Sequence, residues 1–145
     1  MAEHNGVNAR TVSRGDKRIQ KLTFRGHRDL KAFQLAYSLA VEIFRETRTF
    51  PQDEGFSLTS QIRRSSRSAA ANIAEGFRKR QHPSMFASKL ADADAEGTEA
   101  QVWLDCARDC RYLSAEGHKQ LVEKYEEVGR MLNGMISHPE RFAPA

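Results

Sequence analysis

The sequence predicts an all-α protein folded as an antiparallel up-and-down four-helix bundle. In four successive segments, apolar residues recur at steps of three and four, which is the period of an amphipathic helix packed on a core. No segment shows the apolar–polar alternation that is typical of a half-buried strand. The segments are joined by short connections, and helices joined in this way pack antiparallel.

The first helix is predicted over residues 29–48 and the second over residues 56–77. Phe50-Pro51 separates them, because proline disfavours the helical conformation of the residue before it. The expected core stripe of the first helix is Leu30, Phe33, Tyr37, Ala40, Phe44 and Thr47. That of the second is Leu58, Ile62, Ser66, Ala69, Ile73 and Phe77. The small residues in the middle of the second helix predict a close approach to a neighbour, and Gly76 is expected to end the helix.

The third helix is predicted from His82-Pro83, where proline is tolerated in the first turn, to about residue 112. Its stripe repeats as a heptad, which favours shallow helix crossings: Phe86, Leu90, Ala93, Gly97, Ala100, Leu104 and Ala107. A weaker second apolar edge consists of Ala87, Ala91, Thr98 and Val102. Ser114 is the expected N-cap of a fourth helix that ends near Ser137. The stripe of this helix is Leu121, Tyr125, Val128, Leu132 and Met135.

Charge is spread unevenly along the 145 residues, whose formal net charge is +4. Residues 1–28 hold seven basic and two acidic residues, whereas residues 29–145 hold 16 basic and 17 acidic ones. The sequence therefore predicts a disordered basic N-terminal arm over residues 1–27, a nearly neutral bundle over 28–138 and a short tail over 139–145. The arm could contact phosphates by charge, or it could be a solubilising extension or a misassigned start.

Several classes of function find no support in the sequence. No apolar stretch reaches the roughly 18 residues that span a bilayer, and no secretory signal is present, so a cytoplasmic protein without a membrane partner is expected. There is no glycine-rich phosphate loop, no nucleophile motif and no Glu-x-x-His pair for a di-metal site. Cys106 and Cys110 are expected to be reduced, with no zinc bound. We therefore expect no enzyme activity, no cofactor and no metal.

The candidate functional residues lie on the second helix and at its exit. Six of them are basic, against the single acid Glu75, and such a run could bind a phosphate backbone: Arg63, Arg64, Arg67, Arg78, Lys79 and Arg80. Alternatively, some of these arginines pair with acidic residues of the third helix. Gln61, Asn72 and Glu75 lie close to the apolar stripe and would form a structural polar network if buried, with Arg63 or Arg64 as the partner of Glu75.

Two motifs on this helix, Gln61-Ile62-Arg63-Arg64 and Asn72-Ile73-Ala74-Glu75-Gly76, resemble the signature of a known family. It is the four-helix-bundle family named after intervening sequences in bacterial 23S ribosomal RNA genes. The resemblance covers residues 28–138. The chain departs from the family pattern at Ala69 and Ala70, where an isoleucine–proline pair is common, so its second helix is expected to be less kinked.

The resemblance implies a homo-oligomeric, pentameric ring of antiparallel bundles. It also implies similarity to the accessory protein of diversity-generating retroelements, a basic pentamer that binds nucleic acid and a reverse transcriptase. The expected partners are thus further copies of the chain, RNA or DNA, or another protein. The expected function is that of a non-enzymatic nucleic-acid-binding accessory protein. The alternative is a protein-binding or self-assembling scaffold with no nucleic-acid role.

Overall fold

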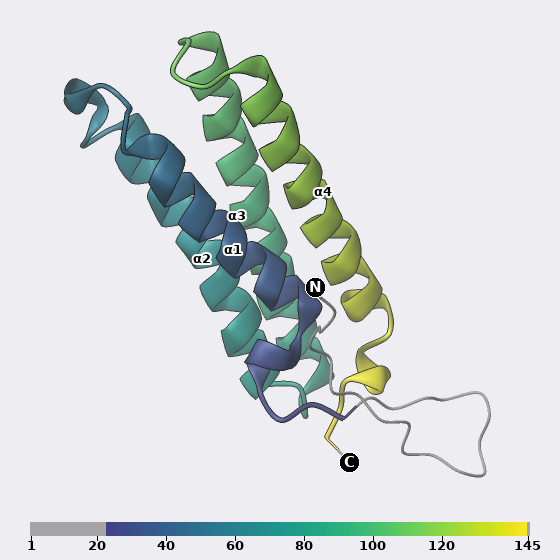
Figure 1. The fold of residues 1–145 in the computed structure, drawn as a ribbon. Coiled ribbons are helices and arrows are strands. Elements are labelled where there is room, and N and C mark those ends of the chain that lie inside the picture. Colours follow the sequence, from purple (N-terminus) through teal and green to yellow (C-terminus); the bar gives the residue numbers. More distant parts are fainter. Residues whose placement is uncertain (1–22, 145) are drawn as a thin grey trace.

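A computed structural model describes residues 23–144 as a four-helix bundle (Figure 1). The predicted arm, residues 1–27, lies outside the described residues up to position 22. The helices are α1 Lys31–Thr47, α2 Leu58–Arg78, α3 Pro83–Asp109 and α4 Ala115–Ser137. Three short 3-10 turns accompany them: η1 His27–Asp29, η2 Gln52–Glu54 and η3 Pro139–Arg141. Residues 23–144 contain no strand. Sequential helices run in opposite directions, and α1 closes the bundle against α4.

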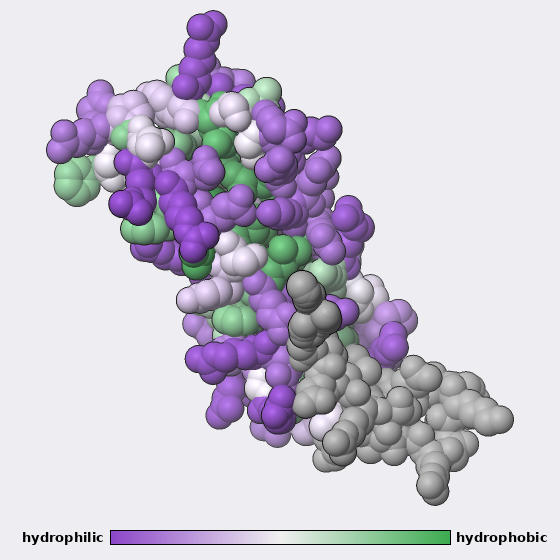
Figure 2. Space-filling model, viewed as in Figure 1, coloured by the Kyte–Doolittle hydropathy of each residue, from purple (hydrophilic) through white to green (hydrophobic). Residues whose placement is uncertain are grey.

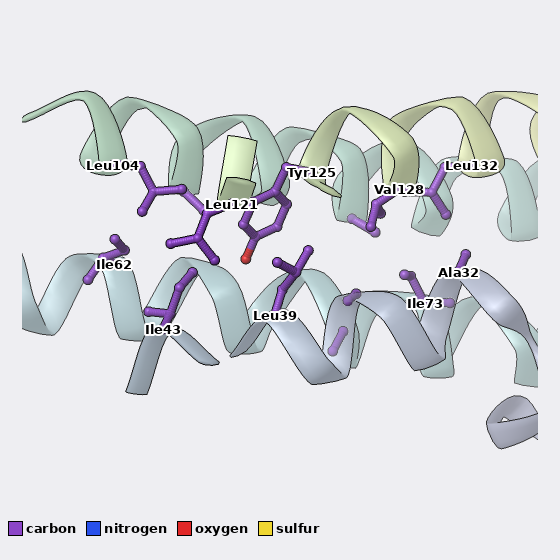
Figure 3. Packing of buried hydrophobic residues seen from close by; sticks show 14 of the residues in the cluster. Ala32, Leu39, Ile43, Ile62, Ile73, Leu104, Leu121, Tyr125, Val128 and Leu132 are labelled. Atoms are coloured by element: carbon purple, nitrogen blue, oxygen red, sulfur yellow. The ribbon is translucent and has the colours of Figure 1, made fainter. Parts of the chain in front are cut away.

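The predicted core stripes of α2, α3 and α4 are confirmed, because every residue of each stripe is buried. Figure 3 shows Ile62 and Ile73 of α2, Leu104 of α3, and Leu121 and Leu132 of α4 meeting between the helices. On the face seen in Figure 2, a strip of apolar surface runs between α1 and α4, with hydrophilic residues on both sides. The steps of three and four therefore predict correctly which face of α2, α3 and α4 is buried.

The predicted core stripe of α1 is wrong at Tyr37 and Phe44, which lie on the surface. Tyr37 is 57% exposed and Phe44 is 39% exposed. The residues that α1 buries lie mostly one position earlier: Ala32, Ala36, Leu39, Ala40, Ile43 and Thr47. The helix carries two adjacent apolar stripes, and the one with small residues faces the core because alanines let α1 approach its neighbours closely. The aromatic stripe is left on the surface.

Gly76 does not end α2, contrary to the expectation from the sequence. The helix continues to Arg78, and Gly76 is buried against α3. A Cβ at this position would lie 3.2 Å from Cβ of Lys89 and 3.3 Å from Cδ2 of Leu90. Any larger residue here would therefore require Lys89 or Leu90 to move by a few tenths of an ångström. The helix runs without a break through Ala69 and Ala70.

The α3–α4 connection shows how both helix ends are satisfied. Arg111 adopts φ 65°, in the left-handed region, and its N–H bonds to the carbonyl of Arg108 at 2.9 Å. The N–H of Tyr112 bonds to the carbonyl of Ala107 at 2.9 Å, which completes a Schellman motif. Ser114 is the N-cap of α4, as predicted, and its Oγ accepts from the N–H of Gly117 at 3.0 Å.

The packed region extends beyond residues 28–138 at both ends. The Phe24 ring stacks on Phe142, with centroids 5.5 Å apart, and meets Phe77 edge-on at 6.3 Å. Phe142 also packs against Phe86 of α3. Residues assigned by polarity to the arm and the tail therefore cover one end of the bundle.

Candidate nucleic-acid interface

Arg64 joins α2 to α3. Its guanidinium hydrogen-bonds the carboxylate of Glu99 and lies 3.3 Å from that of Glu96. Trp103 Nε1 donates to the same Glu99 carboxylate at 3.1 Å. The hydrogen bonds from Arg64 and then Trp103 lower the pKa of Glu99, and the bond to Glu99 raises the pKa of Arg64. The structural alternative, pairing with acids of the third helix, applies to this arginine.

Arg63 joins α2 to the end of α1. Its Nε donates to Thr47 Oγ1 at 2.8 Å, and its guanidinium lies 4.8 Å from the centre of the Phe44 ring. The half-buried arginine therefore covers part of the aromatic stripe of α1. Arg63 and Arg64, two of the six predicted phosphate contacts, are thus engaged within the subunit, and a third, Arg80, donates from Nη1 to the carbonyl of Phe77 at 3.2 Å.

The predicted polar network exists in part, with different partners and at the surface. Glu75 is exposed and pairs with Lys89 Nζ of α3 at 2.7 Å, so the expected pairing with Arg63 or Arg64 is wrong. Lys89 also donates to Asn72 Oδ1 at 3.3 Å, and Asn72 Nδ2 donates to the carbonyl of Ser68 at 2.9 Å.

Gln61, the third member of the predicted network, is exposed, and its Oε1 accepts from Arg64 Nε at 3.4 Å. Only the contacts of Lys89 with Asn72 and Glu75 link α2 to α3, because the Gln61 contact lies within α2. The sequence interpretation omitted Lys89, which links the two motif residues Asn72 and Glu75.

The side chains of Arg67, Arg78 and Lys79 have no hydrogen-bond or ion-pair partner among residues 23–144. Arg67 and Arg78 are exposed and lie 11 positions apart, which is three helical turns, or about 16 Å along one side of α2. These side chains are free to bind an anion.

Four cations and one histidine gather where α2 ends and α1 begins, at the lower end in Figure 1. We call His27, Arg28, Arg78, Lys79 and Arg80 the cationic end cluster. Partial burial, and then the charges of Arg28 and Arg78, lower the pKa of His27.

Burial followed by the charge of Arg78 also lowers the pKa of Arg80, whose guanidinium lies 3.9 Å above the Phe77 ring. Asp29, the acid next to Arg28 in the chain, accepts from the N–H of Arg25 at 2.8 Å. The fold thus holds like charges together, an arrangement that favours binding of an anion. The sequence placed His27 in the arm and gave no reason to bring Arg28 to the exit of α2.

A second surface feature is a groove of about 500 Å³ between α1 and α2. We call it the α1–α2 groove; it is lined by Phe33, Tyr37, Ala40, Val41, Phe44, Arg67, Ala70 and Ala71. Because the aromatic side chains were expected in the core, the sequence did not reveal this surface.

Two further observations concern metals and membranes. Within residues 23–144, no group of three or more histidine, cysteine or acidic side chains is placed to hold a metal ion, and Cys106 and Cys110 are free. None of the helices in this described part has the length and apolar character to cross a bilayer.

A family model described as "23S rRNA-intervening sequence protein" matches residues 28–134. A similar solved structure is that of a protein with unknown function from the S23 ribosomal protein family of Bacteroides thetaiotaomicron. It is 25% identical, with a TM-score of 0.65, and the match covers 72% of this chain and 97% of the other. No curated protein matches the chain.

Proposed function

The chain belongs to the 23S rRNA-intervening sequence protein family, and from this premise we propose that it is a non-enzymatic, self-assembling bundle that binds nucleic acid. The observation that carries the proposal is the cationic end cluster together with the unpaired Arg67. The cations lie along one side and one end of α2, where a phosphate backbone can follow them.

The electrostatics of the cluster support this role. Arg78 acts on both His27 and Arg80, so three positively charged or titratable groups share one small region. A phosphate placed among them would relieve this repulsion and form charge-assisted hydrogen bonds. Binding of this kind releases counterions and weakens steeply as salt rises.

Self-assembly is supported by the distribution of exposed apolar side chains. Tyr37 and Phe44 line the α1–α2 groove, whereas Met85 and Val102 of α3 are 45% and 49% exposed on a different helix. A contact between the groove of one copy and α3 of the next would be heterologous, and such contacts form a ring when the rotation between copies closes. We propose the pentameric ring that the family resemblance implies. A ring would repeat the cationic end cluster in every subunit and so raise the avidity for a long phosphate backbone.

The test is a mobility-shift titration against salt, with the double variant Arg67→Gln/Arg78→Gln. Each lost phosphate contact lowers the slope of log Kobs against log salt by about 1, so the double variant should bind more weakly with a slope reduced by about 2 per site. Arg45→Gln/Arg48→Gln is the matched control, because it removes the same charge from exposed residues near the end of α1. Equal losses in both double variants, or no binding by the wild type at low salt, would contradict the proposal.

The second candidate is a scaffold without a nucleic-acid role, and the engagement of Arg63 and Arg64 within the subunit favours it. In this case Arg64→Ala or Glu75→Ala should alter assembly or stability, with no nucleic-acid affinity to lose. Sedimentation of these variants, beside the salt titration, distinguishes the two functions. Similarity to the accessory protein of diversity-generating retroelements stays a prediction from the sequence.

A further inference from the structure

An apolar pocket opens at the same end of the bundle as the cationic end cluster. It lies between the start of α1 and the end of α4, which are neighbours at the lower end in Figure 1. Its volume is about 420 Å³, within the range of roughly 300–1,000 Å³ that is usual for small-molecule sites. The sequence did not indicate this pocket, because its walls come from segments assigned to the arm, two helices and the tail.

The pocket combines an apolar interior with a basic rim. Leu30, Met131 and Met135 form the apolar interior together with the stacked rings of Phe24 and Phe142. The rim carries three basic side chains and no acidic one: Lys31, His138 and Arg141. His138 lies 3.6 Å from Glu140, whereas Lys31 and Arg141 have no side-chain partner within residues 23–144. An occupant should therefore have a flat or apolar body next to a negative charge.

Aromatic contacts connect the pocket to the cationic end cluster. Phe24 lines the pocket and meets Phe77 edge-on, with centroids 6.3 Å apart. The guanidinium of Arg80 lies over the face of the same Phe77 ring, which is itself buried. Cations and aromatic rings thus alternate over a short distance from the pocket to the exit of α2. This pairing of a positive track with aromatic surfaces is typical of proteins that bind single-stranded nucleic acid.

We propose that the pocket binds one unstacked base of a single-stranded nucleic acid whose phosphates lie along the cationic end cluster. The inference rests on the function proposed above and specifies its ligand. A duplex keeps its bases stacked and paired, whereas a single strand can turn a base outward onto aromatic side chains. Because the lining is almost entirely apolar, the pocket should accept different bases with little preference. An aliphatic acid would fill the pocket equally well but would leave the cationic end cluster unused.

Gly134 offers a way to close the pocket without disturbing the core. It lines the pocket from α4, and a Cβ at this position would meet no heavy atom within 4 Å. Gly134→Leu should therefore fold and fill the pocket with its own side chain. Gly134→Ala is the matched control, because it gains similar helix propensity while adding only a methyl group.

The experiment is a fluorescence anisotropy titration of the full chain with a labelled single-stranded oligo(A) and with the corresponding duplex. For the single strand, Gly134→Leu should weaken binding about ten-fold relative to wild type and to Gly134→Ala. This is the effect of one lost base stack worth about 1.4 kcal/mol. Binding of the duplex should be the same for all three proteins. With 2-aminopurine in the strand, wild type should change the emission of the probe and Gly134→Leu should not.

Two results would overturn the inference, and they have different meanings. If Gly134→Leu binds the single strand as tightly as wild type, the pocket takes another occupant, such as an aliphatic ligand or a segment of this chain, while the proposed function stands. If wild type binds neither single strand nor duplex at low salt, the proposed function fails and the inference fails with it.

Discussion

The ion pair between Arg64 and Glu99 is a direct test of which arginines of α2 serve the fold. Removing Arg64 leaves Glu99 with only the Trp103 indole as a donor among residues 23–144. The two side chains are 48% and 34% exposed, so the pair must be valued as a surface pair, for which 0.2–1 kcal/mol is typical. A second carboxylate, from Glu96, lies 3.3 Å from the same guanidinium, which places the expected coupling at the upper end, about 1 kcal/mol.

A double-mutant cycle measures this coupling. Urea unfolding of wild type, Arg64→Ala, Glu99→Gln and the double variant, at one fixed protein concentration, gives the interaction free energy. Arg45→Ala is the control, since the side chain of this exposed arginine has no partner within residues 23–144, lies outside the α1–α2 groove and should change stability by less than about 0.5 kcal/mol. A coupling near zero would refute the structural role of Arg64. So would a loss of nucleic-acid affinity in Arg64→Ala that equals the loss in Arg78→Gln.

The same pair predicts a pH dependence. Arg64 lowers the pKa of Glu99 in the folded state below its ordinary value of 4.5. The contribution to stability is therefore fully present above pH 4.5 and is lost as the pH falls through the folded pKa. The difference in unfolding free energy between wild type and Arg64→Ala should shrink in this acidic range. A difference that stays constant down to the acid limit of folding would contradict the assignment.

Three further predictions follow from individual contacts. Arg111→Gly should raise the free energy of unfolding by about 1 kcal/mol in a urea titration, because glycine adopts φ 65° without the Cβ clash; a loss of stability would contradict the Schellman assignment. Tyr37→Ser should lower the mass of the assembly in analytical ultracentrifugation, whereas Phe56→Ser, at a fully exposed residue outside the α1–α2 groove, should leave it unchanged. The bond of 2.9 Å to Glu54 raises the pKa of Tyr112 to about 12, so Glu54→Gln should return its ultraviolet titration toward 10; an unchanged titration would mean that the bond does not form in solution.

For three of the four helices, α2, α3 and α4, the sequence was sufficient to predict which face packs against the core. In α3, the heptad stripe holds the large apolar residues Phe86, Leu90 and Leu104, whereas the second apolar edge consists mainly of small residues, so the heptad stripe faces the core. In α1, apolar residues occupy two adjacent stripes. The stripe with the larger, aromatic side chains was predicted to face the core, but the stripe with the smaller side chains does so. Which stripe is buried depends on how closely α1 approaches α2 and α4. The small side chains of Ala32 and Ala36 permit this close approach, but it is a property of the packed helices and cannot be predicted from the sequence pattern of α1 alone.

For the candidate site, the sequence identified the residue types but not their partners. Pairing of an α2 arginine with acids of the third helix was foreseen as an alternative, and Arg64 does this. Pairing of Arg64 with Glu75 was wrong because the two lie 11 positions apart on one continuous helix, a distance of about 16 Å. The cationic end cluster could not be predicted, because it requires Arg28 and Arg78, which are far apart in the sequence, to meet at one end of the bundle.

The salt dependence of nucleic-acid binding by the wild-type protein tests the central claim most directly. If the cationic end cluster and Arg67 bind phosphates, log Kobs should fall linearly with log salt, with a slope of about −0.7 per phosphate for a single strand. Several contacts in each subunit predict a slope steeper than about −2. A slope near zero, or no complex at low salt, would contradict the account and leave the bundle as a scaffold.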